Sequence, residues 1–336
     1  MRQKHYTIPV FIPQLACPFQ CIYCNQRNIS GQQKVPSAKE IVKTIDKYLS
    51  TIPAENSYTE IGFFGGSFTG LPIVEQEMFL KIVQPYLESG DIKGIRLSTR
   101  PDYINENILE ILKQFHVSTI ELGAQSIDDE VLRLSGRGHT FKDIDRASRL
   151  INEYGFSLGL QMMLGLPGDT LEKSVNTAKA IVELYADNTR IYPTLVIKDT
   201  ELEKLFRGNK YKPLSLDIAV EWTKEVYKIF EEAGVTVLRM GLHPSEGLIS
   251  GKSLIAGPFH VSFGELVMTA IWKDVFNSLW KNLKMKSAVV AVPPEQLAYA
   301  IGYGASNKKM LLEHFKEIKF ITDPLLKGRN YHVDYC

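Results

Sequence analysis

The stretch Cys17-Pro18-Phe19-Gln20-Cys21-Ile22-Tyr23-Cys24 holds three of the chain's four cysteines, with the spacing C-x3-C-x2-C. It follows an apolar run, Tyr6 to Ile12, that is typical of a β-strand. Three thiolates on one short loop can bind three irons of a 4Fe–4S cluster, and because such clusters usually take four cysteine ligands, one iron stays open. The fourth cysteine, Cys336, is the last residue. The sequence therefore predicts a single cluster with an open iron.

These cysteines could also bind zinc or form a disulfide. A structural zinc site needs four closed ligands, and His5 is the nearby candidate for the fourth. A disulfide would leave an odd thiol, and cytosolic cysteines are normally kept reduced. We therefore favour the cluster over zinc, and zinc over a disulfide.

The composition is that of an ordinary globular protein. The 336 residues suggest two domains or one large α/β unit. The formal net charge of +1 gives no global argument for nucleic acid, although a local basic groove would not show in composition. The basic start of the chain leads into an apolar run broken by Pro9 and Pro13, which resembles neither a signal peptide nor a membrane span. We expect a cytoplasmic protein with no membrane partner.

Strand and helix patterns alternate along the first two thirds of the chain. The first helix is predicted at a capping box, Ser37 with Glu40, and helices are expected between all later strands. The predicted strands after the first are Thr59 to Phe64, Gly94 to Leu97, Val117 to Leu122, Ser157 to Leu164 and Arg190 to Val196. Such alternation predicts parallel βα units, which right-handed crossovers curl into a full or partial barrel. A doubly wound sheet stays open as an alternative. In a barrel the site falls at the carboxyl ends of the strands.

The cysteine spacing, with Tyr23 before the last cysteine, resembles the radical S-adenosylmethionine (SAM) superfamily. The resemblance implies a partial (β/α)6 barrel with a 4Fe–4S cluster on Cys17, Cys21 and Cys24, which are both the metal ligands and the catalytic residues. SAM would complete the open iron, and its reductive cleavage would give a 5′-deoxyadenosyl radical that modifies the substrate. A flavodoxin- or ferredoxin-like electron donor is implied as a partner.

Four longer stretches narrow the resemblance. Ser98 to Tyr103, Gly123 to Ser126, Gly136 to Thr140 and Ile191 to Ile197 resemble the radical SAM half of the elongator catalytic subunit family, which acts on the wobble uridine of tRNA. Some of these elements are shared with the coproporphyrinogen oxidase and haem-chaperone family. The chain has a shorter first cysteine gap than the elongator family and no Gly-rich acetyl-CoA loop after the barrel. Acetyl transfer is therefore not expected.

The resemblance also assigns cofactor contacts. A Gly-Gly pair after the second strand commonly binds the SAM ammonium, Gln125 and Ser126 match the ribose and carboxylate region, and Arg137 matches an arginine near the SAM carboxylate. Arg137 could instead form a salt bridge with Asp128 or Asp129. The predicted cofactor residues are Tyr23, Gly65, Gly66, Ser67, Ser98, Arg100, Gln125, Ser126, Arg137 and Gln161. Met162 and Met163 are expected in the core or beside adenine.

Residues 1–209 are predicted to form the barrel, and residues 210–336 an α/β extension that packs on it and closes its open side. Ser215 to Glu232 is expected to be an amphipathic helix and Val235 to Met240 a strand of this extension. Substrate contacts are expected from strand ends and Gly/Pro-rich turns, where side chains could face the mouth of the barrel. These candidates are Tyr192, Lys198, Arg239, His243, His260 and Glu265.

Three functions stay open at this point. The first is a radical SAM enzyme that modifies RNA of the tRNA kind, which predicts a basic groove and salt-dependent RNA binding. The second is a radical SAM enzyme acting on a small metabolite or peptide, which predicts an enclosed pocket. The third is a non-enzymatic haem carrier on the same barrel, which predicts haem binding without turnover of SAM.

Overall fold

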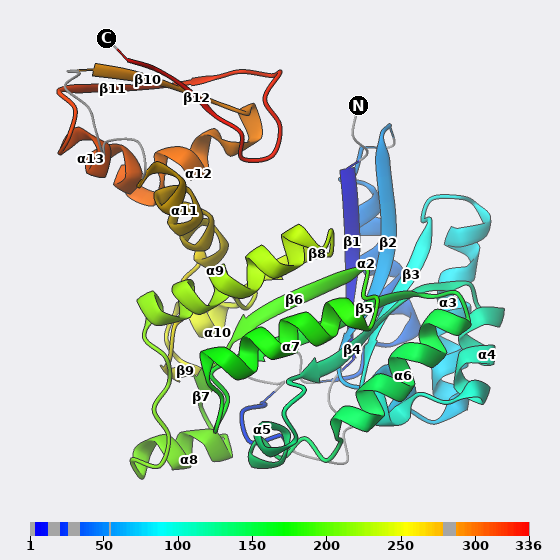
Figure 1. Ribbon diagram of the computed structural model, residues 1–336. Helices are drawn as coiled ribbons and strands as arrows, with labels where there is room; N and C mark the ends of the chain where they lie inside the picture. The colour runs from blue at the N-terminus through cyan, green and yellow to red at the C-terminus, as the bar shows by residue number, and fades with distance from the viewer. Residues whose placement is uncertain (1–3, 13–20, 26–33, 54, 278–286, 336) are drawn as a thin grey trace.

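The computed structural model describes residues 4–12, 21–25, 34–53, 55–277 and 287–335. Its centre is a seven-stranded, wholly parallel sheet with the order β1-β2-β3-β4-β5-β6-β8, curled into a half-barrel (Figure 1). The strands are β1 (Lys4–Ile12), β2 (Ser57–Gly65), β3 (Gly94–Thr99), β4 (Val117–Gln125), β5 (Ser157–Leu164), β6 (Asn188–Pro193) and β8 (Thr236–Met240). The predicted partial barrel is confirmed.

The barrel has one strand more than the six predicted. The run Val235 to Met240 was assigned to the extension, but in the structure β8 pairs in parallel with β6 and completes the large sheet. Its connection from β6 includes the long helix α9 (Leu216–Glu232), which packs against α7 (Leu171–Glu183). A parallel crossover needs such a helix, so α9 and β8 form one more βα unit.

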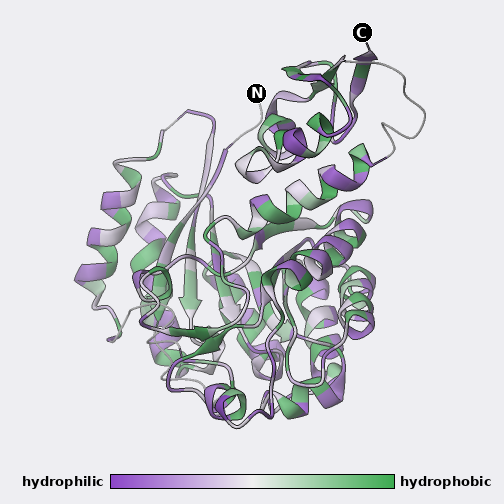
Figure 2. Cartoon of the chain, turned by 90° about the vertical axis from the view of Figure 1, so that its left-hand side faces the viewer, coloured by the Kyte–Doolittle hydropathy of each residue, from purple (hydrophilic) through white to green (hydrophobic). Residues whose placement is uncertain are grey.

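Helices cover the outer face of the sheet, as right-handed crossovers require. They are α2 (Ala38–Leu49), α3 (Ile73–Glu88), α4 (Glu106–Gln114), α6 (Phe141–Glu153) and α7, whereas α5 (Asp129–Leu134) lies at the carboxyl ends of the strands, where Val131 packs near Tyr23 and Tyr192. The predicted capping box is present, since Ser37 N–H donates to Glu40 Oε2 at 2.7 Å and the Ser37 side chain accepts from Glu40 N–H. Helix α2 buries Ile41 and Ile45 against the sheet, and the hydrophobic and hydrophilic sides of such helices are visible in Figure 2.

The rest of the chain forms smaller layers. Beside the barrel mouth lie α8 (Glu201–Arg207), α10 (Glu246–Ile249) and a two-stranded antiparallel sheet of β7 (Val196–Ile197) and β9 (Leu254–Ala256). Helix α11 (Phe263–Phe276) packs on α9. It leads to a three-stranded sheet of order β11-β10-β12, with β10 (Ser287–Val292), β11 (Glu317–Thr322) and β12 (His332–Tyr335), accompanied by α12 (Leu297–Ile301) and α13 (Ser306–Leu312).

This last sheet has a hydrophobic core of its own, built on Trp272, Phe276 and Val290. It lies at the end of the molecule where the barrel strands begin, far from their carboxyl ends (Figure 1). Among the described residues of the extension, those that reach the barrel mouth therefore belong to its first part, up to β9. The division at residues 209 and 210 stays a prediction.

Within the described ranges, the structure contains no helix that is both long and apolar enough to cross a membrane.

Candidate cofactor and substrate site

The described part of the cysteine loop, residues 21–25, lies over the carboxyl ends of the strands, where backbone hydrogen bonds hold it on two sides. Ile22 N–H donates to the Ser135 carbonyl at 3.1 Å, and Leu202 N–H donates to the Ile22 carbonyl at 2.7 Å. These bonds fix the loop between the end of α5 and the start of α8. Cys24 N–H donates to the Cys21 carbonyl at 2.9 Å, so a tight turn brings the two cysteines together.

Cys17, the third predicted ligand, lies outside the described residues. Within the residues that are described, no three His, Cys, Asp or Glu side chains are grouped as metal ligands. The structure thus shows two of the three predicted cysteines on one turn.

A cavity of about 770 Å³ opens inside the half-barrel beneath this loop. That volume falls within the range of roughly 300–1,000 Å³ that is usual for small-molecule sites. All the predicted cofactor residues except Ser126 line it, and they come from the cysteine loop, from the strands near their carboxyl ends and from the segment after α5: Tyr23, Gly65, Gly66, Ser67, Ser98, Arg100, Gln125, Arg137 and Gln161. Cys21 and Cys24 line the same cavity.

The Gly-Gly pair after β2 has a clear conformational reason. Gly65 has φ 108°, and a Cβ there would lie 2.6 Å from the Ile12 carbonyl oxygen. Gly66 N–H donates to that same oxygen at 2.8 Å. Glycine therefore lets the ends of β1 and β2 close up beneath the cysteine loop.

Arg137 connects the cysteine loop to the end of β4. Its Nη1 lies 3.3 Å from Cys21 Sγ and 3.5 Å from the Tyr23 hydroxyl, and its Nη2 donates to the Gly123 carbonyl at 2.5 Å. Its Nε is buried without a hydrogen-bond partner among the described residues. Burial alone would lower the pKa of Arg137, but Tyr23 and Cys21 raise it, so the guanidinium stays charged. The alternative salt bridge is absent among the described residues: Asp128 pairs with Lys173 at 3.2 Å, and Asp129 Oδ1 accepts from Phe141 N–H at 2.8 Å.

Gln125 is held in a strained conformation at the end of β4. It has φ 67°, in the left-handed region that non-glycine residues rarely adopt. His139 Nε2 lies 3.4 Å from the Ala124 carbonyl, next to the Gly123 carbonyl that Arg137 binds. Burial, with Arg137 and Arg100 as further causes, lowers the pKa of His139 to about 3. A neutral His139 and a charged Arg137 thus hold two successive carbonyls and support the geometry of Gln125.

Other predicted residues have different surroundings. Gln161 Nε2 lies 3.5 Å from Gln125 Oε1, so the two amides face each other across the cavity wall. Ser126 lies outside the lining; its hydroxyl accepts from Asp128 N–H at 3.1 Å, just before α5. Arg100 binds Asp102 through two hydrogen bonds of 2.9 Å and donates to the Arg137 carbonyl at 2.6 Å.

The two methionines separate. Met162 is fully buried in the main core, whereas Met163 lines the cavity and packs near Tyr23. Met162 thus has the expected core position, and the position of Met163 beside adenine stays a prediction.

A network of four charged residues, which we call the floor, was not predicted from the sequence: Glu60 (β2), Arg96 (β3), Glu121 (β4) and Arg190 (β6), of which Glu121 and Arg190 also line the cavity. Arg96 donates to Glu60 and to Glu121 at 2.6 Å each, and Arg190 donates to Glu121 at 2.8 and 3.0 Å. The Glu60 and Glu121 side chains are 1% and 3% exposed. Charged residues inside otherwise apolar strands were the available signal, because burying them requires partners.

The substrate candidates divide into two groups. Tyr192, Arg239 and His243 line the same cavity as Cys21 and Cys24. Lys198 and Glu265 are exposed and lie outside the lining.

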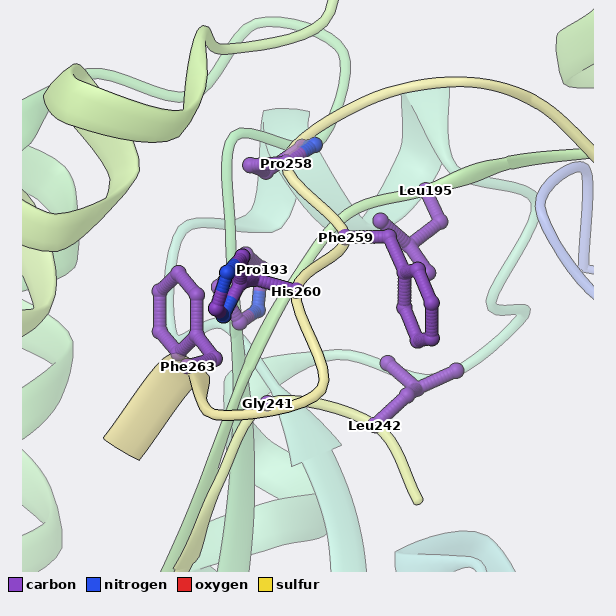
Figure 3. Close-up of a pocket in the computed structure, with 8 residues that line it drawn as sticks. All are labelled: Pro193, Leu195, Gly241, Leu242, Pro258, Phe259, His260 and Phe263. Carbon is purple, nitrogen blue, oxygen red and sulfur yellow. The ribbon is translucent and has the colours of Figure 1, made fainter. Parts of the chain in front are cut away.

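His260 also lies away from the large cavity. It borders a separate gap of only about 10 Å³ beside Pro193, Gly241 and Phe263 (Figure 3), space for about one water molecule. Its Nδ1 accepts from Ser262 N–H at 3.1 Å, and its ring meets Tyr303 edge-on at 5.1 Å. These contacts are those of a packed residue.

Family models match most of this architecture. The radical SAM superfamily model covers residues 11–181, and the Radical_SAM C-terminal domain model covers residues 186–273. The chain therefore belongs to the radical SAM superfamily and is a radical SAM enzyme, a class defined by a 4Fe–4S cluster and SAM.

The individual relatives have low sequence identity to this chain. The tRNA uridine(34) acetyltransferase of Dehalococcoides mccartyi is 26% identical over 239 residues, which is 61% of this chain and 52% of the relative. An uncharacterised protein of Methanocaldococcus jannaschii is 30% identical over 223 residues, 63% of this chain and 68% of that protein. The chain spans about half the length of the acetyltransferase relatives it matches.

Among solved structures, the archaeal Elp3 of Methanocaldococcus infernus with an N-terminal deletion superposes with a TM-score of 0.66 at 22% identity. The match covers 82% of this chain and 64% of that one. At this identity the likeness shows the shared fold.

Proposed function

We propose that this radical SAM enzyme binds its 4Fe–4S cluster through Cys17, Cys21 and Cys24 and modifies RNA, with tRNA as the first candidate substrate. One observation carries the proposal. A single cavity is lined both by two of the cysteines and by Tyr192, Arg239 and His243, so that a substrate group held at the second set would share one chamber with the cofactor. The choice of tRNA is supported by relatives whose names describe action on tRNA uridine.

The described residues fit the cluster. The turn from Cys21 to Cys24 presents both thiols to the cavity, and Arg137 offers an N–H 3.3 Å from Cys21 Sγ. Cysteine thiolates are the ligands that iron–sulfur clusters use, and hydrogen bonds to their sulfurs adjust the reduction potential. When bound, the cluster would supply the electron that cleaves SAM into methionine and a 5′-deoxyadenosyl radical.

The chain's own residues would bind and orient SAM. The glycine turn at Gly65 and Gly66 allows close backbone approach, and the amides of Gln125 and Gln161 can hydrogen-bond ribose hydroxyls. The buried Nε of Arg137 is a donor that still needs an acceptor, which a carboxylate would provide.

The cavity wall would also protect the reaction. Phe11, Phe64, Met163, Leu195 and Ile197 line it, which makes much of the wall apolar. An apolar wall limits the number of ordered water molecules beside the reacting groups, and side reactions fall accordingly. The protein thus contributes orientation and exclusion, and the cofactor contributes the chemistry.

The test begins with anaerobic reconstitution with iron and sulfide. Dithionite and SAM are then added, and 5′-deoxyadenosine is quantified with and without tRNA. We expect the wild-type chain to form deoxyadenosine, and Cys24→Ala to form none. Cys336→Ala is the matched control, because it removes a cysteine that the proposal does not use, and it should behave like the wild type.

The substrate is tested separately. Nucleosides from treated tRNA are analysed by mass spectrometry, and RNA binding is measured at several salt concentrations, since phosphate contacts make it salt-dependent. Unmodified tRNA together with deoxyadenosine formation would point instead to a small metabolite or peptide. A protein that holds zinc and no cluster would contradict the whole proposal, and a stable cluster or haem complex without SAM cleavage would favour a carrier. A flavodoxin or ferredoxin should replace dithionite as the electron donor.

A further inference from the structure

The wall of the cavity formed by β6 and β8 carries two arginines side by side. Arg190 on β6 pairs in register with Arg239 on β8, and both line the cavity. The register shifts between Thr189 and Arg190, so that Leu238 is skipped and Arg239 lies opposite Arg190. Because a slip of one residue exchanges the two faces of a strand, this irregularity decides that an arginine borders the cavity.

The two arginines differ in their pairing. Arg190 forms two hydrogen bonds with Glu121, whose carboxylate also accepts from Arg96, and Arg96 in turn pairs with Glu60. These two carboxylates and two guanidiniums cancel in charge. Arg239 is half-buried and forms no ion pair with any of the described residues. The wall therefore carries one positive charge in excess.

The groups around Arg239 are mostly neutral and can form hydrogen bonds to the same ligand. Burial raises the pKa of the neighbouring Tyr192 although Arg190 opposes this, so its hydroxyl keeps its proton at neutral pH. Burial and Arg239 lower the pKa of His243, which is therefore neutral. Glu246 is the acidic residue that lines this part of the cavity, and it is exposed at the rim. Arg239 and Tyr192 thus present two donors, with no carboxylate bound to the guanidinium.

We propose that Arg239, with the Tyr192 hydroxyl, binds an oxyanion of the substrate, a phosphate or a carboxylate, in the chamber that also holds the cysteine turn. A half-buried guanidinium gains most from an anion that it can bind through more than one N–H. Arg190 is less suited to this task, because Glu121 already neutralises its charge and accepts from its Nε and Nη2. The inference deepens the proposed function, since it assigns the substrate of that site to the anionic class.

The experiment measures binding directly on the full chain, both cluster-loaded and cluster-free. Inorganic phosphate, acetate, uridine 5′-monophosphate and unfractionated tRNA are titrated by calorimetry into the wild type, Arg239→Gln, Arg239→Lys and Arg207→Gln. Arg207 is the matched control, because it is an exposed arginine that pairs with Glu203, and neither residue lines the cavity. Circular dichroism confirms that each variant is folded.

We expect Arg239→Gln to weaken anion binding roughly 10- to 100-fold, the range for losing hydrogen bonds to a charged group. Arg239→Lys should recover part of it, and Arg207→Gln should match the wild type. Binding of phosphate and the nucleotide identifies a phosphate ester, binding of acetate alone a carboxylate, and binding of tRNA alone a polymer phosphate. In the last case the salt dependence should fall by about one charge in Arg239→Gln.

Wild-type binding that Arg239→Gln leaves unchanged would overturn the proposal, and so would a wild type that binds none of the four probes. Neither result bears on the cluster, because deoxyadenosine formation from SAM tests the proposed function independently. Conversely, a chain that failed to cleave SAM could still bind anions through Arg239 in its cluster-free form.

Discussion

Arg96 and Arg239 both stand on strands of the same parallel sheet, but one lies in the floor of the cavity and the other on its open wall. Arg96 is 6% exposed and bonded to two carboxylates, whereas Arg239 is half-buried and has no ion-pair partner within the described part of the chain. In the floor, the buried guanidinium groups and carboxylates form ion pairs with one another. The mouth of the cavity is formed by Cys21, Gly65 and Arg137. The wall and the mouth both leave N–H donors for a ligand, and the mouth lets a ligand approach the backbone closely.

Residue type alone therefore does not distinguish structural arginines from ligand-binding ones. Burial of a charge is costly unless it is paired and hydrogen-bonded, so a fully paired arginine serves the fold. An arginine without an ion-pair partner in a cavity contributes little to the stability of the fold, and its charge is available to bind a ligand. The predictions below test this contrast by removing one group at a time.

The largest effect is expected in the floor. Glu121→Gln leaves Arg96 and Arg190 short of a carboxylate while both stay largely buried. We expect a loss of roughly 3–5 kcal/mol in the free energy of unfolding, the usual result of breaking a buried ion pair from one side. Urea denaturation of the cluster-free protein measures it. The exposed pair of Arg149 and Asp145 is the control, since Arg149→Gln should cost less than about 1 kcal/mol. Equal losses of stability in Glu121→Gln and Arg149→Gln would contradict the distinction between the floor and the surface.

The second effect concerns the mouth. Gly65→Ala forces a Cβ to within 2.6 Å of the Ile12 carbonyl at φ 108°. We expect a loss of roughly 2–3 kcal/mol in stability, in the range known for strained backbone positions. Gly251→Ala, also at positive φ (72°) but with open space around it, separates the two causes and should cost less. A Gly65→Ala variant as stable as the wild type would show that the β1–β2 closure is adaptable.

The third prediction uses pH. The pKa of His139 is lowered to about 3 in the folded protein, against 6.5 when unfolded, so the unfolded state binds a proton that the folded state refuses as pH falls below 6.5. Stability should therefore fall by about 2 kcal/mol between pH 7 and pH 5 through this group. His139→Asn should show a flatter dependence, measured by urea denaturation at both pH values. His243 contributes in the same direction, and His243→Asn serves as the comparison.

The smallest effect on stability is expected on the wall. Arg239→Gln removes a charge with no ion pair in the described structure, so the free energy of unfolding should change by less than about 0.5 kcal/mol. The same variant should lose anion binding, as argued above. A large loss of stability would mean that Arg239 supports the fold as Arg96 does, and the contrast between the two regions would fail.

Much of the fold followed from local patterns. The alternation of strands and helices predicted the barrel, and the capping box at Ser37 and Glu40 predicted where α2 begins. The strand-end motifs were expected to gather at one edge, and the cavity lining does unite Gly65, Gln125 and Arg137. These successes share a cause, because parallel strands bring their carboxyl ends together whatever the details of packing.

The misses depend on pairing across distant segments. The seventh strand was assigned to the extension, since no local signal states that β8 pairs with β6. The four floor residues come from four different strands and are recognisable as partners only once those strands are neighbours. Ser126 and His260 lie outside the lining of the large cavity, and their assignment to ligand binding stays a prediction.

The sequence by itself determined the superfamily, the cysteine turn and the order of βα units, because these rest on spacing and periodicity within short windows. Only the tertiary structure decided which charged groups neutralise each other. The register shift at Leu238 shows the reason: a single skipped residue places Arg239 beside Arg190 at the cavity, and register is a property of two paired strands.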